Sequence, residues 1–147
     1  MLFIPTPEHV VRKTREPHIV KSCFCQEGHS LISPKVHFEG HPGILIKIRQ
    51  GRHMGYIGIN PVCGHKNRID IDIDLVDGDI IHFLCPVTGL ELPVYGPCEC
   101  GGSLIALFLD DTGDYSNCIG ICNRVGCKHS ILILANQLFS CTGLHPL

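Results

Sequence analysis

The chain has 147 residues, of which 44% are hydrophobic, and a formal net charge of −2. The length fits one ordinary domain, and the apolar fraction excludes an intrinsically disordered tail, because this much apolar surface can offset the entropy lost on folding. The longest apolar runs, over 104–109 and 131–135, are far shorter than the roughly 18 residues that a membrane-spanning helix needs. The first residues lack the pattern of a secretory leader, so we expect a cytoplasmic protein with no membrane association.

Residues 1–20 contain three prolines and are expected to form an N-terminal arm, with one short helix beginning after Thr6. Beyond the arm, short segments rich in Ile, Val and Leu are bounded by Gly, Pro or Asp, which predicts β-strands. These segments are 44–48, 56–60, 68–76, 80–84, 104–109 and 131–134. No long segment beyond the arm has the 3.6-residue apolar period of a helix, so we expect a mostly β fold.

The segment 68–76 has the clearest strand pattern in the sequence. Its isoleucine and leucine side chains alternate with three aspartates, which places the apolar residues on one face of a strand. Asp77-Gly78 follows, and this dipeptide is typical of tight hairpin turns. We therefore predict a β-hairpin over 68–84.

Ten cysteines and ten histidines are the most unusual feature of the composition. Eight of them form four pairs with one residue between the partners. The pairs are Cys23/Cys25, Cys63/His65, Cys98/Cys100 and Cys127/His129. Cysteines two apart are poorly placed to bridge each other, whereas a tight turn can direct both side chains at one ion. Since histidine cannot enter a disulfide, the spacing favours metal sites over a disulfide framework or buried free thiols.

A short internal repeat organises these pairs. Residues 22–32 read SCFCQEGHSLI, residues 97–105 read PCECGGSLI, and a Cys-x-His pair follows each copy. We therefore predict two related halves, 21–76 and 77–135, with a C-terminal tail over 136–147. Three thiolates and one imidazole make a closed tetrahedral zinc site, so each half would bind one Zn²⁺. The predicted ligands are Cys23, Cys25, Cys63 and His65 in the first half, and Cys98, Cys100, Cys127 and His129 in the second.

Two segments resemble the knuckles of zinc-ribbon proteins. Residues 83–92 read FLCPVTGLEL, in which Cys85-Pro-Val-Thr-Gly is similar to the first knuckle, Cys-Pro-x-Cys-Gly, with Thr88 in place of its second cysteine. Residues 97–104, PCECGGSL, look like the second knuckle. The resemblance implies a small metal-stabilised fold of knuckles and β-hairpins. It leaves open whether Cys85 joins Cys98 and Cys100.

Residues 117–130, NCIGICNRVGCKHS, hold enough ligands for a complete site by themselves. These ligands are Cys118, Cys122, Cys127 and His129. This grouping is an alternative to the pairing by halves, so we expect two or three zinc ions in total. His29, His37, His41 and Cys141 are further candidate ligands whose role the sequence leaves open.

Charge is divided unevenly along the chain. Residues 1–69 carry ten Lys or Arg and four Asp or Glu, a formal +6, and residues 70–147 carry two and ten, a formal −8, which together give −2. The low overall charge argues against avid nonspecific nucleic-acid binding, although the basic first half keeps such a partner open.

The sequence is most consistent with a zinc-binding protein whose structural Cys/His sites support a binding module for a protein or nucleic-acid partner. One alternative is a metal storage or transfer protein, in which surplus ligands would exchange metal. A zinc-dependent enzyme has less support, because the sequence has neither a His-Glu-x-x-His motif nor a deaminase-like pairing of His-x-Glu with Cys-x-x-Cys.

Overall fold

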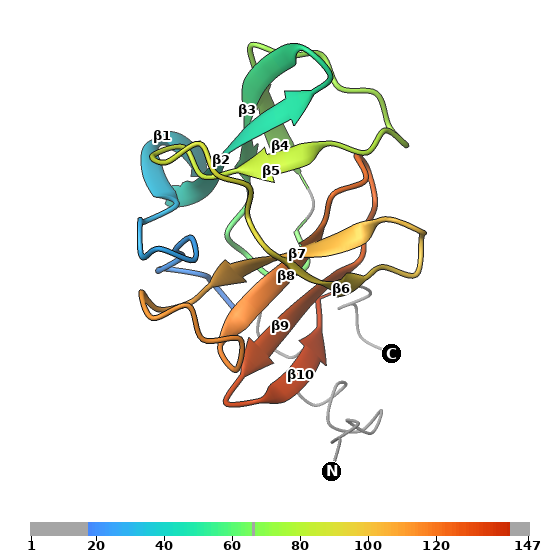
Figure 1. Ribbon diagram of the computed structural model, residues 1–147. Coiled ribbons are helices and arrows are strands. Elements are labelled where there is room, and N and C mark those ends of the chain that lie inside the picture. The colour runs from blue at the N-terminus through green and yellow to red at the C-terminus, as the bar shows by residue number, and fades with distance from the viewer. Residues whose placement is uncertain (1–17, 66, 142–147) are drawn as a thin grey trace.

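A computed structural model describes residues 18–65 and 67–141 of the chain. These residues form two five-stranded antiparallel sheets and contain no helix (Figure 1), which confirms the small, mostly β fold. The helix predicted after Thr6 lies outside the described residues. Within the described part of the chain, no helix is long and apolar enough to cross a membrane.

The first sheet is built around one long central strand, β2. Its strands are β1 (Ile32–Phe38), β2 (His41–Gln50), β3 (His53–Ile59), β4 (Arg68–Ile71) and β5 (His82–Leu84). β2 pairs with β3 on one side and with β1 and β5 on the other, and β4 extends the sheet beyond β3. Ile44, Ile46 and Ile48 of β2 are buried at alternate positions, as the period of two in a strand requires.

The second sheet is a meander of consecutive strands in the order β10-β9-β8-β7-β6. Its strands are β6 (Val94–Pro97), β7 (Ser103–Phe108), β8 (Cys118–Cys122), β9 (Ser130–Leu134) and β10 (Gln137–Ser140). Ala135 and Asn136 form the two-residue turn between β9 and β10 with φ values of 50° and 67°, the left-handed conformation that such hairpin turns need. The segment predicted as a C-terminal tail therefore contributes a strand as far as Ser140.

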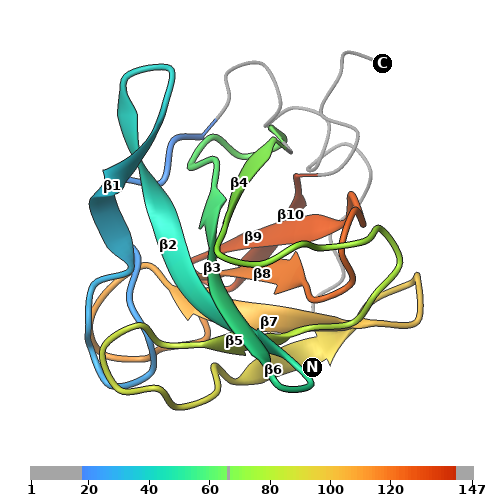
Figure 2. The ribbon, with the colours of Figure 1, turned by 90° about the horizontal axis from the view of Figure 1, so that it is seen from above.

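The two sheets pack face to face, and strands of one cross over strands of the other (Figure 2). The main core lies between them and takes buried side chains from both sheets, including Ile46 and Ile48 of β2, Leu107 of β7 and Leu132 of β9. Burying each of these side chains contributes about 1.5 to 3 kcal/mol. The core thus holds together two parts of the chain that are separate in sequence.

Backbone hydrogen bonds also join the parts of the chain across the boundary between the sheets. Phe24 and Phe108 exchange two N–H···O bonds of 2.7 and 2.9 Å, which attach the segment before β1 to the end of β7. In the segment before β5, Ile81 N–H donates to the Asn123 carbonyl at 3.0 Å, and the Asp79 carbonyl accepts from Val125 N–H at 2.8 Å. The segment before β5 therefore runs beside the connection between β8 and β9.

The predicted hairpin over 68–84 is wrong. β4 pairs with β3 and β5 pairs with β2, so the two strands lie on opposite sides of the β2–β3 pair. β4 ends at Ile71, and the next residue, Asp72, has a φ of 63°, outside the extended range of a strand. The alternating apolar residues further along, Ile73 and Leu75, pack against the core from an irregular segment.

The sheets divide the chain between Leu84 and Val94, whereas the predicted halves meet at 76/77. Of the predicted strands, 44–48, 56–60, 104–109 and 131–134 coincide with β2, β3, β7 and β9. The four strands β1, β6, β8 and β10 were not predicted, and two of them, β6 and β8, lead into the candidate metal centre described next.

Candidate metal centre

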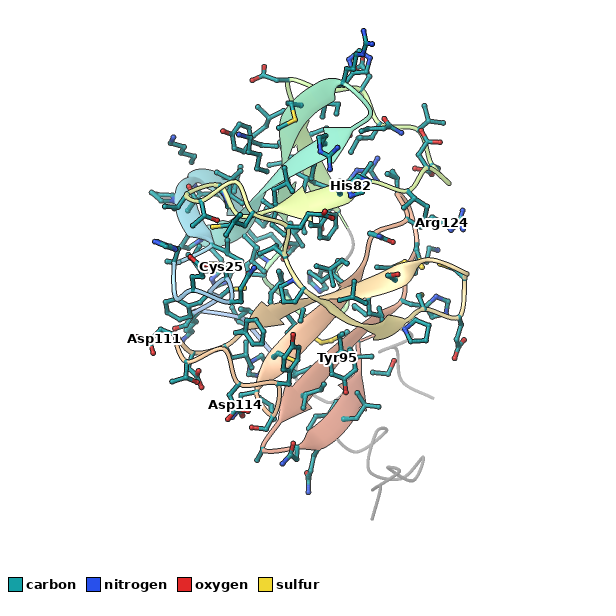
Figure 3. The ribbon with its side chains drawn as sticks, in the orientation of Figure 1. Cys25, His82, Tyr95, Asp111, Asp114 and Arg124 are labelled. Atoms are coloured by element: carbon teal, nitrogen blue, oxygen red, sulfur yellow. A yellow bond between two sulfur atoms is a disulfide. The ribbon has the colours of Figure 1, made fainter. Side chains whose placement is uncertain are left out.

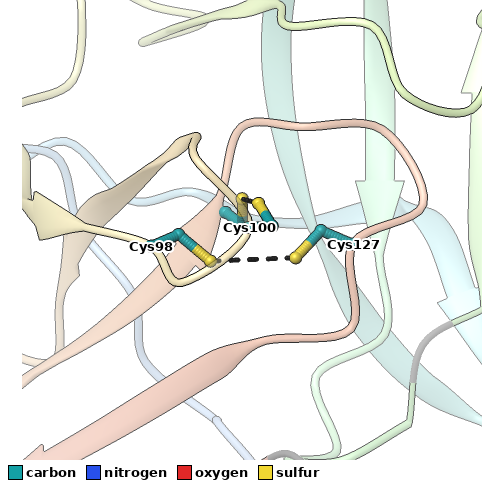
Figure 4. A group of neighbouring side chains, drawn as sticks. Cys98, Cys100 and Cys127 are labelled. Carbon is teal, nitrogen blue, oxygen red and sulfur yellow. Dashed lines mark hydrogen bonds between the residues drawn. The ribbon is translucent and has the colours of Figure 1, made fainter.

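Four cysteine side chains meet at one end of the second sheet. They are Cys98, Cys100, Cys122 and Cys127, whose Sγ atoms all lie within 4.8 Å of one another. The Cys98 and Cys127 sulfurs are 3.8 Å apart, and the Cys100 and Cys122 sulfurs are 3.4 Å apart (Figure 4). Tetrahedral Zn–S bonds of about 2.3 Å place neighbouring sulfurs about 3.8 Å from one another. This four-thiol site could therefore hold one metal ion.

A tight turn and the strand register bring these four residues together. In the turn after β6, Cys98 N–H donates to the Gly102 carbonyl at 2.9 Å, and Gly101 N–H donates to the Cys98 carbonyl at 3.0 Å. Gly101 has a φ of 98°, which is favourable only for glycine. Pairing of Leu104 with Cys122 then places the end of β8 beside the turn.

A backbone N–H group donates to each of the four sulfurs, and the donor is in each case the residue two positions on. Gly102 donates to Cys100, Arg124 to Cys122 and His129 to Cys127, each at 3.4 Å, and Cys100 donates to Cys98. Such donors stabilise a thiolate, which is the form that binds metal. The Gly102 N–H lowers the pKa of Cys100 to about 6.

Burial acts in the opposite direction on Cys98 and Cys122. It raises the pKa of Cys98 and, more strongly, that of Cys122, so both are protonated at neutral pH when no cation is bound. Four adjacent thiolates repel one another unless a cation neutralises them. One acidic thiol beside two protonated ones is therefore suited to a metal that displaces their protons.

A second group lies near the turn that precedes β1. It contains Cys25, His29 and Cys85, whose ligand atoms all lie within 4.8 Å of one another. The Cys25 sulfur is 3.6 Å from Nδ1 of His29, and both cysteines are buried. Among the described residues this three-ligand site has no fourth Cys, His, Asp or Glu within the same distance.

The turn at Cys25 has the same backbone hydrogen bonds as the turn at Cys98. Cys25 N–H donates to the His29 carbonyl at 2.9 Å, and Gly28 N–H donates to the Cys25 carbonyl at 3.0 Å. By these hydrogen bonds Cys25 is equivalent to Cys98, whereas the sequence repeat places Cys23 opposite Cys98. A common origin for the two segments stays a prediction.

Cys85 lies in the turn that resembles a zinc-ribbon knuckle. Burial opposes ionisation of this thiol, but hydrogen bonds from the backbone N–H groups of Thr88 and Val87 outweigh burial and lower its pKa. The Thr88 hydroxyl also hydrogen-bonds to the Cys85 sulfur. Thr88, which stands where the zinc-ribbon pattern has its second cysteine, thus stabilises the Cys85 thiolate through hydrogen bonds from its backbone N–H and its hydroxyl.

The predicted site of the first half is not assembled. Cys63 forms a disulfide with Cys141 and has no free thiolate, and Cys25 lies with Cys85 instead. His65 is exposed, with Nδ1 3.6 Å from the Glu39 carboxylate. Cys23 is fully buried in the core, where burial strongly raises its pKa and opposes metal binding.

Three of the four ligands predicted for the second half, Cys98, Cys100 and Cys127, are brought together, but neither predicted grouping is complete. His129 Nδ1 is 3.2 Å from the Cys127 sulfur, but its Nε2 is 3.5 Å from Glu99, and the fourth position of the site belongs to Cys122. Cys118 is fully buried at the other end of β8, where burial raises its pKa to about 11. The predicted set of four between residues 117 and 130 is therefore divided, with Cys122 and Cys127 facing Cys98 and Cys100.

No protein-family model matches this chain, and no curated protein or solved structure is significantly similar to it. The metal-binding groups are therefore defined by the geometry of the chain itself.

Proposed function

We propose that this chain is a zinc-binding protein in which the four-thiol site holds a structural Zn²⁺ ion. The convergence of four cysteine sulfurs on one point carries the proposal. Four sulfur donors select zinc or iron over hard cations, and all four positions of a tetrahedral ion would be filled by protein. A closed site of this kind stabilises a fold and leaves no position for a substrate. We propose that the knuckles at both sites are of the zinc-ribbon type, and that the three-ligand site holds a second Zn²⁺.

The proposed role of this zinc-supported fold is to bind a protein partner. Val94 and Tyr95 lie on β6, an edge strand of the second sheet, and are 57% and 40% exposed. The Tyr115 ring lies 6.5 Å from the Tyr95 ring and is also exposed. Exposed aromatic residues beside an open strand edge are typical of protein interfaces.

The charge around this aromatic surface favours a protein over a nucleic acid. Asp114 directly precedes Tyr115, and Figure 3 shows Asp111 and Asp114 on the loop between β7 and β8, at one end of the second sheet. Carboxylates repel phosphates, and nucleic-acid binding depends on cations at the contact surface.

Zinc content measured on single-cysteine variants tests the metal sites. We expect two zinc ions in the purified protein by native mass spectrometry and elemental analysis. Cys98→Ser and Cys122→Ser each lose one ion, whereas Cys118→Ser, on the same strand as Cys122 but outside both groups, keeps two. Full zinc content in Cys98→Ser, or iron in place of zinc, would contradict the proposal.

Site-specific photo-crosslinking tests the partner surface. A photoreactive residue at position 95 should capture one protein, and the same residue at the exposed Val76 should not. The captured protein, once purified, should bind the native chain at least tenfold more tightly than a variant carrying Tyr95→Ala and Tyr115→Ala. Equal capture from position 76, or equal affinity for the variant, would refute the assignment of this surface.

The three-ligand site favours a second candidate function, the transfer or storage of metal. With Cys25, His29 and Cys85 as its ligands, a tetrahedral ion keeps one position for an exchanging ligand. A chelator should then remove one of the two zinc ions at least tenfold faster than the other, and His29→Ala should abolish the fast phase only. Equal rates of removal would exclude a handling role.

A further inference from the structure

A cavity of about 290 Å³ lies between the two sheets, next to the four-thiol site. Its apolar walls come from both sheets, with Ile57 and Phe83 on the first and Ile119 and Ile121 on the second. The volume is near the lower end of the range for small-molecule sites, and it is about twice the ~150 Å³ that admits benzene. The space therefore suits a compact apolar body of one or two rings.

Apart from Cys122 and Cys127, which belong to the four-thiol site, the ionisable residues that line this cavity are basic. Three are lysine or arginine, two are histidine, and none of the described lining residues is aspartate or glutamate. These residues are Arg68, Arg124, Lys128, His65 and His129. A ligand that carries a negative charge is therefore favoured over a cationic one.

Arg124 differs from the other arginine at the cavity in its partners. Arg68 pairs with the Asp70 carboxylate at 2.9 Å. Arg124 donates from one terminal nitrogen to the Gly78 carbonyl at 2.7 Å, and no carboxylate of the described residues pairs with it. Its Nε atom is buried and has no hydrogen-bond partner in the described part of the chain.

A buried N–H group without an acceptor is unfavourable. Arg124 as a whole is half-buried, and its charge has no anionic partner among the described residues. A carboxylate would relieve both conditions, because guanidinium and carboxylate form short, charge-assisted hydrogen bonds. Arg124 is thus the cavity residue best suited to fix the polar end of a ligand, while the walls accommodate its apolar body.

We propose that this cavity binds a small organic acid with an aromatic or branched aliphatic body, and that its carboxylate pairs with Arg124. This site is separate from the proposed protein-binding surface at β6. Cys122 and Cys127 belong to both the cavity wall and the four-thiol site, so the zinc ion proposed for that site would fix the position of the wall that carries Arg124.

Binding of three matched naphthalene compounds to the zinc-loaded full chain tests this proposal. Calorimetry should give a dissociation constant for 2-naphthoate at least tenfold below that of 2-naphthylmethanol, and 2-naphthylmethylamine should not bind. Methyl resonances of Ile57 and Ile119, on facing walls, should both shift with naphthoate. No binding of naphthoate, or equal affinity for the acid and the alcohol, would overturn the proposal.

Two kinds of variant separate the contribution of the Arg124 charge to binding from that of the cavity volume. Arg124→Met should weaken naphthoate at least tenfold and leave the alcohol unchanged, whereas Arg49→Met, at a half-buried arginine of β2 outside the cavity, should change neither. Ile121→Phe and, on the facing wall, Ile57→Phe should each block both ligands. Zinc content identifies the variants that keep their fold. Unchanged naphthoate affinity in Arg124→Met, or in a folded variant with the filled cavity, would overturn the proposal.

Discussion

The Cys63–Cys141 disulfide closes a loop with a sequence separation of 78 residues. Replacing both cysteines with alanine restores to the unfolded chain the conformational entropy that the closed loop removes. The chain-entropy relation gives a loss of about 4.5 kcal/mol at 25 °C for a loop of this length. Small domains have a total free energy of unfolding of about 5 to 15 kcal/mol, so the double variant should be close to the limit of stability.

Urea unfolding of the zinc-loaded protein measures this loss. With a slope of ~2 kcal/mol per molar urea, the unfolding midpoint of the Cys63→Ala/Cys141→Ala variant should fall by about 2 M. Cys118→Ala is the matched control, because Cys118 is a buried free thiol outside both metal groups. That control should lose on the order of 1 kcal/mol. A double variant no less stable than the control would refute the reasoning.

Two further predictions follow from particular residues. Zinc binding at the four-thiol site near pH 7.5 should release at least two protons, because burial raises the pKa of Cys98 and of Cys122. Calorimetry in buffers of different ionisation enthalpy counts the released protons. Release of fewer than one proton would contradict the assigned protonation. Gly55→Ala should lower the free energy of unfolding by about 1 to 3 kcal/mol, since the added carbon would lie 2.6 Å from the Ile71 carbonyl oxygen. Gly96→Ala, whose added carbon meets nothing within 4 Å, should stay within about 0.5 kcal/mol of the native protein in the same denaturation assay.

The strands that the sequence predicted well are those with an uninterrupted apolar pattern and burial to match it. In β2 the alternation of Ile44, Ile46 and Ile48 corresponds directly to the buried face. In 68–76 the same kind of alternation led to the wrong prediction of a hairpin. The pattern indicates which side chains favour one face, but not where the backbone stops being extended. Asp72 leaves the strand conformation while Ile73 still reaches the core.

The metal ligands were predicted only in part for a related reason. Cys98 and Cys100 belong to a local turn, which spacing along the chain can indicate. Cys122 joins them because Leu104 pairs with it across β7 and β8, and β8 was not predicted as a strand. The signal for this strand in the sequence is CIGIC, an alternating apolar segment with a cysteine at each end. An extended strand over these residues places Cys118 and Cys122 at its opposite ends, so they cannot ligate the same ion.

His29 and Cys85 show the limit of spacing arguments more clearly. They are 56 positions apart, and they meet because Leu45 of β2 hydrogen-bonds to Leu31, just after His29, while β5, just before Cys85, also pairs with β2. Such long-range contacts depend on the pairing of distant segments and leave no periodic signal in the sequence.

The two metal groups differ in how soon they can form during synthesis. Cys25 and Cys85 are 60 positions apart, whereas the four-thiol ligands lie within a span of 29 positions, from Cys98 to Cys127. At about 5 to 20 residues per second, roughly 3 to 12 s separate the synthesis of Cys25 from that of Cys85. During that interval the turn at Cys25 offers a passing metal ion only two donors. A metal ion at the three-ligand site would therefore be captured only when β5 joins the first sheet and brings Cys85 into place, so metal capture there would report directly on the folding of that sheet.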